Sequence, residues 1–463
     1  ATNMYNVAVG HGAGEAVTAG VENTLIGGQT GDAITTGYYN TALGKDALST
    51  NVLSSINVAI GHSALKTANS GAGEHHNVAV GGYAGTAVTT GIKNTLIGGL
   101  SGDALTVGNS NTAVGQNSLG TDTQGDLNTA IGIGTLQSQN FTSSTDSYNT
   151  AVGGFAGGNV TTGTHNTLIG GLAGNSNTAG TDIVAVGYQA LTTFNRTSGA
   201  SKVVGIGNQA FYSLTTGTQN TAVGHQAGYS QTNVNNNSFL GYRAGYVVST
   251  GSSNVCIGSE AGDGVDTGFS NVIMGANAAS ADVVLTTGKE NVILGANTYT
   301  TAVNADGANI IGYNVAGAAG YTTLGLQASD IRAAHGNVTW ATVSDQRYKK
   351  DIVNSTAGLA FINDLTPRTF KYKNLGELPE TFSAYKADST DVFKNSNINH
   401  GFIAQEVKIA IDAHSELKDG FKLWDERDDG GQELAESALI PMLVKAIQEL
   451  SAKNDALEAR LTT

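Results

Sequence analysis

A five-residue phrase recurs at a fixed interval through most of this chain. It reads Asn, then Thr or Val, a small or apolar residue, an aliphatic residue and Gly, and its first copies begin 17 residues apart. The copies start at Asn6, Asn23, Asn40, Asn57, Asn77, Asn94, Asn111, Asn128, Asn149, Asn166, Asn220, Asn237, Asn254, Asn271 and Asn291, with variants at Ile183 and Val203 and weaker copies at Ala308 and Tyr321. A unit of 17 residues is too short for a helical hairpin, and its β-branched content favours strands. The repeat therefore predicts a mainly β fold, a β-solenoid of about 19 stacked coils that bury a shared core.

Each coil has a predicted internal layout. A second phrase such as Ala33–Gly37 (AITTG) follows the first, so we expect two short β-segments per coil. Because side chains alternate along a strand, we expect Val7 and Val9 to face inward and the small third residue, such as Ala8, to face a close neighbour or solvent. The equivalent asparagines of successive coils are expected to form a hydrogen-bonded ladder. Cys256, at the third position of its phrase, is expected to be a packed small residue.

Composition changes at residue 344. Residues 1–343 contain 57 of the 63 glycines, 8 basic and 17 acidic side chains, whereas residues 344–463 contain all three prolines, 15 basic and 20 acidic side chains. No basic face is evident in a chain of net charge −14, which argues against nucleic-acid binding. The sequence also shows neither an apolar stretch long enough to span a membrane nor a secretory signal, so no membrane insertion is expected.

The segment after this boundary resembles a known family. Its four characteristic stretches are SDQRYKKDI (344–352), LTPRTFKYK (365–373), HGFIAQEV (400–407) and ALIPMLVKAIQEL (438–450). They resemble, in the same order, the peptidase S74 intramolecular chaperones of phage tail fibres and tail spikes. The resemblance implies a domain that forms trimers, guides folding of the preceding fibre and is then released by self-cleavage. It implies a cut between Val343 and Ser344, with Ser344 as the nucleophile and Lys349 as the base.

The chemistry of that pair imposes a geometric condition. A serine hydroxyl becomes a good nucleophile only when a base takes its proton, and a lysine serves as that base only when burial or a nearby cation lowers its pKa. Five residues along an α-helix correspond to about 140° of rotation beyond a full turn, so Ser344 and Lys349 would not share a helical face. Contact then requires Ser344 to lie outside the helix or the partners to come from different subunits. The alternative is that Ser344 and Asp345 only cap a helix.

The last segment predicts a coiled coil over about residues 440–461. Apolar residues and one Asn follow the alternating spacing of three and four at Ile440, Leu443, Ile447, Leu450, Asn454, Leu457 and Leu461. A polar residue at one core position is a device that fixes register and oligomeric state. The alternative is an amphipathic helix packed on its own domain.

Other chemistry has little support. The histidines show no metal-ligand spacing, the glycine–aspartate turns have the wrong spacing for calcium repeats, and acidic residues in the repeat are too sparse to suggest a glycosidase. We therefore expect neither a metal nor a cofactor. Aromatic residues at turns (Tyr83, Phe155, Tyr188 and Tyr242) would either stack on a glycan receptor or simply cover the turns.

Together these features predict a trimeric phage tail fibre with three parts. They are a β-solenoid shaft over residues 1–325, a linker over 326–343 and a small α+β chaperone domain over 344–463. The expected partners are two further copies of the chain, a host cell-surface receptor such as a glycan, and other tail proteins of the virion, with assembly in the host cytoplasm. The shaft also resembles the β-roll heads of trimeric adhesins, so a cell-surface adhesin and a glycan-degrading tail spike are the alternatives.

Overall fold

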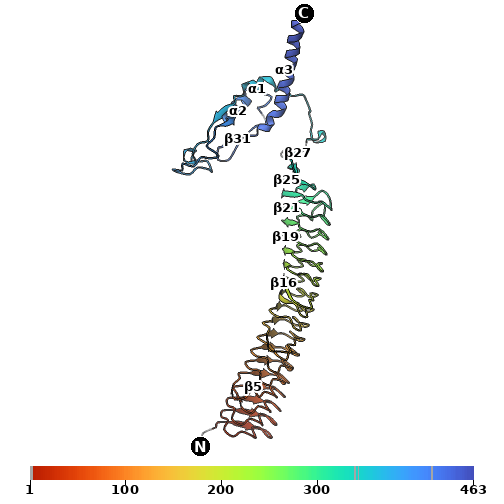
Figure 1. Cartoon of the computed structure of the whole chain (residues 1–463), viewed down its shortest axis with the longest axis vertical. Coiled ribbons are helices and arrows are strands. Elements are labelled where there is room, and N and C mark those ends of the chain that lie inside the picture. The colour runs from red at the N-terminus through yellow and green to blue at the C-terminus, as the bar shows by residue number, and fades with distance from the viewer. Residues whose placement is uncertain (1–3, 338–339, 343, 419–420, 463) are drawn as a thin grey trace. The chain divides into compact units, whose positions relative to one another are not determined.

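The chain divides into two compact units, residues 1–343 and residues 344–463, which are described separately below. The computed structural model describes residues 4–337, 340–342, 344–418 and 421–462. Figure 1 shows the first unit as coils stacked one on the next, and the second unit as a group of short helices and strands that ends in α3.

The first unit is the predicted β-solenoid, with about 19 turns and a repeat of about 17 residues. Each coil contributes one short strand to a parallel sheet, and equivalent residues pair, as Ala8 does with Leu25. The parallel strands are β1 (Val7–Val9), β2 (Thr24–Ile26), β3 (Thr41–Leu43), β5 (Val58–Ile60), β7 (Val78–Val80), β8 (Thr95–Ile97), β9 (Thr112–Val114), β11 (Thr129–Ile131), β13 (Thr150–Val152), β14 (Thr167–Ile169), β15 (Thr181–Val186), β16 (Ala200–Ile206), β17 (Thr221–Val223), β18 (Ser238–Leu240), β19 (Val255–Ile257), β20 (Val272–Met274), β21 (Val292–Leu294), β23 (Asn309–Tyr313) and β25 (Tyr321–Leu326).

The side of the strand that faces the core is opposite to the predicted one. From β2 onward the third residue of each phrase is buried, as with Ala42 at 0% exposure, and the residues on either side of it are not. In the terminal strand β1 all three residues are exposed, with Val7 at 49% and Val9 at 56%. The prediction was wrong because it kept the leading asparagine, and with it the small third residue of the phrase, out of the core. Asn23 is in fact fully buried. Cys256 follows the same pattern, is fully buried as expected, and burial raises the pKa of its thiol.

A ladder of asparagines makes this burial possible and confirms the predicted hydrogen bonding. The backbone N–H of Asn254 donates to Oδ1 of Asn237 at 2.7 Å, and Nδ2 of Asn254 donates to the carbonyl of Gly268 at 2.8 Å. The same pattern recurs from coil to coil, for example from Asn40 to Asn23. Leaving a buried polar group unpaired costs about 1–3 kcal/mol. The ladder therefore removes a penalty that each coil with a buried leading asparagine would otherwise carry.

The second phrase of the coil is not a strand. Residues 33–37 form a bend in which Ile34 and Gly37 are buried, and Ile34 contributes its side chain to the core. Six two-residue strands form three separate pairs beside the main sheet: β4 (Ser54–Ser55) with β6 (Gly73–Glu74), β10 (Gly125–Asp126) with β12 (Thr145–Asp146), and β22 (Tyr299–Thr300) with β24 (Ala316–Gly317).

The glycine that ends the first phrase is required by close stacking. Gly10 has a φ of +133°, and a Cβ atom placed there would lie 2.3 Å from the carbonyl oxygen of Gly27. The neighbouring coil therefore leaves no room for a side chain at this turn.

Part of the predicted linker 326–343 belongs to the sheet. Strand β26 (Ser329–Ala334) pairs antiparallel with β25, and β27 (Ala341–Thr342) pairs antiparallel with β26. The repeat therefore ends in a hairpin that covers the last parallel strand, which reduces the exposure of an unpaired sheet edge.

In its described residues the second unit combines three α-helices with short strands and 3-10 helices. In chain order these are η1 (Gln346–Tyr348), α1 (Leu359–Asp364), β28 (Arg368–Phe370), η2 (Leu375–Glu377), β29 (Asn399–Gly401), α2 (Ala404–Ala413), β30 (Trp424–Glu426), β31 (Gln432–Leu434), η3 (Glu436–Leu439) and α3 (Ile440–Leu461). Its core includes Phe361 from α1, Val407 and Ile411 from α2, Leu423, and Met442 from α3.

Helix α3 has two apolar faces with different surroundings. Met442 and Ala446 are buried against the rest of the unit. The residues with heptad spacing remain open, with Leu443 42% exposed and Ile447 66% exposed. The helix thus packs on its own domain through one face and leaves the predicted coiled-coil face uncovered, so the coiled coil stays a prediction.

Candidate functional site

The first residues of the second unit form a compact turn. Asp345 caps η1, and its Oδ1 accepts a hydrogen bond from the backbone N–H of Arg347 at 2.8 Å. The guanidinium of Arg347 also pairs with this carboxylate, with Nη2 to Oδ2 at 2.6 Å. The Arg347 side chain lowers the pKa of Asp345.

The turn brings Ser344 and Lys349 into direct contact. Nζ of Lys349 donates a hydrogen bond to Oγ of Ser344 at 2.8 Å. Because η1 is only three residues long, Ser344 lies before it and Lys349 follows it with an extended backbone, φ −119° and ψ 145°. The two residues are therefore not separated by 140° as they would be on an α-helix, and their contact forms within one chain. Helix capping is present as well, but Asp345 performs it, so the two interpretations of this segment are compatible.

The pair is exposed in a single chain. Neither Ser344 nor Lys349 is buried, and η1 contributes no buried residue. A lysine base needs desolvation or a nearby cation, and the nearest candidate cation on η1, Arg347, is neutralised by Asp345. Val343, the residue on the other side of the predicted cut, lies outside the described residues. The geometry thus places the predicted nucleophile and the predicted base in contact without enclosing them.

The aromatics predicted to stack on a glycan are partly exposed turn residues. Their exposed fractions range from 45% at Phe155 to 52% at Tyr188, but they belong to separate coils. Tyr83 packs edge-on against His62 at 5.0 Å between ring centroids, and Tyr242 stacks on His225 at 5.6 Å. These contacts agree with the simpler interpretation that the aromatics cover turns. Within the described residues, no group of His, Cys, Asp or Glu is arranged to hold a metal ion.

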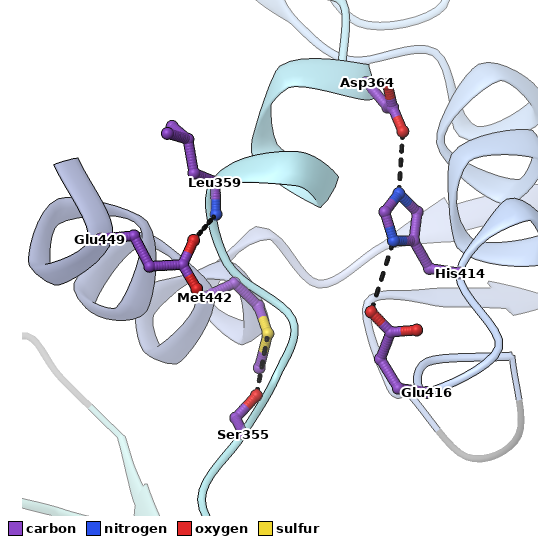
Figure 2. A network of polar contacts seen from close by, with 7 residues as sticks. All are labelled: Ser355, Leu359, Asp364, His414, Glu416, Met442 and Glu449. Atoms are coloured by element: carbon purple, nitrogen blue, oxygen red, sulfur yellow. Dashed lines mark hydrogen bonds and ion pairs between the residues drawn. The ribbon is translucent and has the colours of Figure 1, made fainter. Parts of the chain in front are cut away.

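Sequence reasoning missed a polar network that fixes α1 at both ends (Figure 2). At its start, the backbone N–H of Leu359 donates to Oε2 of Glu449 on α3 at 2.9 Å, and this bond is the main cause of the lowered pKa of Glu449. At its end, Asp364 contacts Nε2 of His414 at 2.8 Å. These partners lie 90 and 50 residues apart in sequence, so no local pattern indicates them.

His414 lies between two carboxylates, as Figure 2 shows, with Glu416 3.4 Å from Nδ1. Its side chain is only 13% exposed and meets the ring of Phe361 edge-on at 5.4 Å between centroids. The hydrogen bond to Asp364 is the largest cause of a raised His414 pKa, with burial acting in the opposite direction. The network therefore ties α1 to the segment after α2 most strongly when the imidazole is protonated.

The second unit should accordingly lose stability in a defined pH range. A histidine whose pKa is raised in the folded state stabilises it fully below its ordinary value of 6.5, and this contribution disappears as pH rises through the folded-state pKa. We expect the unfolding midpoint followed by Trp424 fluorescence, in a Trp340→Phe background, to fall as pH increases above 6.5. His414→Gln and Asp364→Asn should flatten this dependence. An unchanged pH slope in both variants would contradict the assignment.

Comparison with known proteins identifies the beginning of the second unit. Residues 344–415 match the family Peptidase_S74, described as the chaperone of endosialidase. No curated protein and no solved structure matches the chain. Within the described part of the chain, no helix is both long and apolar enough to cross a membrane. A β-solenoid shaft followed by a C-terminal unit that matches the S74 chaperone family fits a protein of the tail-fibre or tail-spike type.

Proposed function

We propose that this chain is a homotrimeric tail fibre that assembles with the help of its C-terminal unit and then cuts itself once, between Val343 and Ser344. The observation that supports this most directly is the 2.8 Å contact between Nζ of Lys349 and Oγ of Ser344. The contact lies at the first residue of the second unit, so a cut there would separate the two units without breaking either.

Ser344 and Lys349 together supply the groups that this cleavage needs. Lys349, in its neutral form, takes the proton from Oγ of Ser344, and the oxygen attacks the carbonyl carbon of residue 343. The C–N bond to Ser344 breaks while a C–O bond forms, and the proton passes to the amine that is released. Water then hydrolyses the ester, which leaves a carboxylate on residue 343 and restores the serine hydroxyl.

The exposure of the pair suggests when the reaction occurs. In the single chain the pair lacks the desolvation that a lysine base needs. We propose that neighbouring copies cover the turn during assembly, so that cleavage follows trimer formation. Cutting before assembly would release the chaperone too early.

The proposal is tested by the masses of the purified product. We expect two polypeptides on a denaturing gel, and intact-mass measurement should assign them to residues 1–343 and 344–463. A product cut at another bond would overturn the proposed site, and a single uncut chain from a sample that is trimeric would overturn the self-cleavage.

Host attachment is the biological role that we propose for the shaft. The fit to a tail-fibre type of protein supports this role. The expected receptor is a cell-surface component such as a glycan, and other tail proteins would hold the fibre on the virion. The alternatives are a cell-surface adhesin and a glycan-degrading spike. The spike would need acidic residues that converge on the shaft, and residues 1–343 contain only 17 acidic side chains spread along the repeat.

A further inference from the structure

The outer face of the main sheet carries a continuous apolar row. The fourth residue of the five-residue phrase, directly before its glycine, is Val, Ile, Leu or Met in all nineteen coils. None of these nineteen residues is buried. We call these residues the outer row: Val9, Ile26, Leu43, Ile60, Val80, Ile97, Val114, Ile131, Val152, Ile169, Val186, Ile206, Val223, Leu240, Ile257, Met274, Leu294, Ile311 and Leu324.

This pattern is not explained by the fold of one chain. The core of the solenoid is filled by the third residue of the phrase and by residues of the following turns, such as Ile34 and Leu48, so the outer row contributes nothing to it. Several of its members are widely exposed, with Leu240 at 50% and Ile311 at 46%. A water-facing position in a repeat would be expected to vary between polar residues, as the turn positions do. Uniform aliphatic identity at an exposed position indicates a surface that is covered in the assembled protein.

The size of the row is sufficient for an interface. Nineteen coils spaced by about 4.8 Å give a stripe about 90 Å long, and with the flanking first strand residue it is about 10 Å wide. The resulting area of roughly 900 Å² per copy is shared between two neighbours in a trimer, so three copies would together bury about 2,700 Å², which lies in the range of obligate assemblies.

The period of the row identifies its occupant. A partner must present apolar side chains at the same spacing along the same length, and a second copy of this chain in parallel register does so coil by coil. Charge agrees, because a chain of net charge −14 repels its copies, and the outer row contains no charged residue. The insertions of three or four residues between some coils leave the row intact, since strand pairing stays in step across them, as between Ile60 and Val80.

We propose that the outer row is the face through which the shafts of three copies pack against one another, in parallel and with equal coils side by side. The inference rests on the trimer of the proposed function and adds the surface and the register. It also assigns a role to the exposed heptad face of α3, which would align the copies at the C-terminal end.

Cysteine cross-linking in the full chain tests this. The single native thiol, Cys256, is fully buried and leaves a clean background. In the trimer, Ile131→Cys and Leu240→Cys should each give covalently linked chains on a denaturing gel after treatment with a short thiol-specific cross-linker. Control cysteines at exposed positions away from the row, Ser143→Cys and Thr250→Cys, should remain single chains.

Register is tested by mixing. Co-expressed Ile131→Cys and Leu240→Cys chains should yield links only between chains with the same substitution. Mixed links would overturn the equal register.

The outcomes separate this inference from the proposed function. Sedimentation of the unmodified protein reports the oligomer directly, and a monomer would overturn both. A trimer whose outer-row cysteines do not link, or link no better than the controls, would overturn the outer row as the interface and leave the trimer standing.

Discussion

The Ser344→Ala variant should be isolated as one uncut chain of 463 residues, whereas the unmodified protein yields two fragments. The substitution removes the oxygen that attacks the carbonyl of residue 343, and among the hydrogen bonds described Lys349 contacts no other hydroxyl. The fold of the second unit should be unaffected, because Ser344 is exposed and its side chain contacts only Lys349 among the hydrogen bonds described. Intact-mass measurement distinguishes the two results directly.

The neighbouring lysines provide a matched comparison. Lys349→Met should slow cleavage by about 10²–10⁴-fold, the usual contribution of a general base. Lys350→Met removes an equal charge from the next residue, which makes no such contact with Ser344, and it should be cut normally. Asp345→Ala tests the helix-capping interpretation. Loss of the cap should lower the stability of η1 more than it lowers the rate of cleavage. A fully processed Ser344→Ala product would refute the nucleophile assignment.

The sequence predicted the stacking of coils well but not the direction that their side chains face. The 17-residue period, the phrase-ending glycines and the asparagine ladder all follow from one requirement, that equivalent residues of successive coils lie above one another. The facing direction depends on whether Asn23 can be buried, and burial depends on bonds to Asn6 and Gly37 that become evident only once coils are stacked. The polar character of asparagine was therefore a misleading guide to the burial of the first residue of the phrase.

The candidate site shows a similar division. The residue types at 344 and 349 were identified through the family resemblance, and their contact depends on a 3-10 turn of three residues, which sequence spacing does not distinguish from an α-helix. The network around His414 was not predicted, because a lone histidine carries no information about carboxylates such as Asp364 that approach it only in the fold.

Residues 1–343 expressed without the second unit should accumulate mostly as insoluble aggregate. Neighbouring coils are nearly equivalent, so a chain displaced by one coil against another still places aliphatic residues opposite aliphatic residues along the outer row. Such wrong registers differ little in free energy from the correct one, and each leaves apolar surface uncovered at its ends.

In the proposed function the C-terminal unit changes this, because it would fix the register before the shaft forms. The exposed heptad face of α3, with Asn454 at one core position, offers one preferred alignment of the copies, and coils can then add from that end. A Leu443→Glu, Ile447→Glu double variant of the full chain should therefore aggregate like the truncated shaft, since both residues are exposed and their loss leaves the folded unit intact. Glutamates on the exposed side of the same helix but outside the heptad row, as in Ala452→Glu, should leave assembly unchanged. Solubility and sedimentation of the four proteins give the comparison, and soluble trimers that resist heating from residues 1–343 alone would show that the shaft finds its register without help.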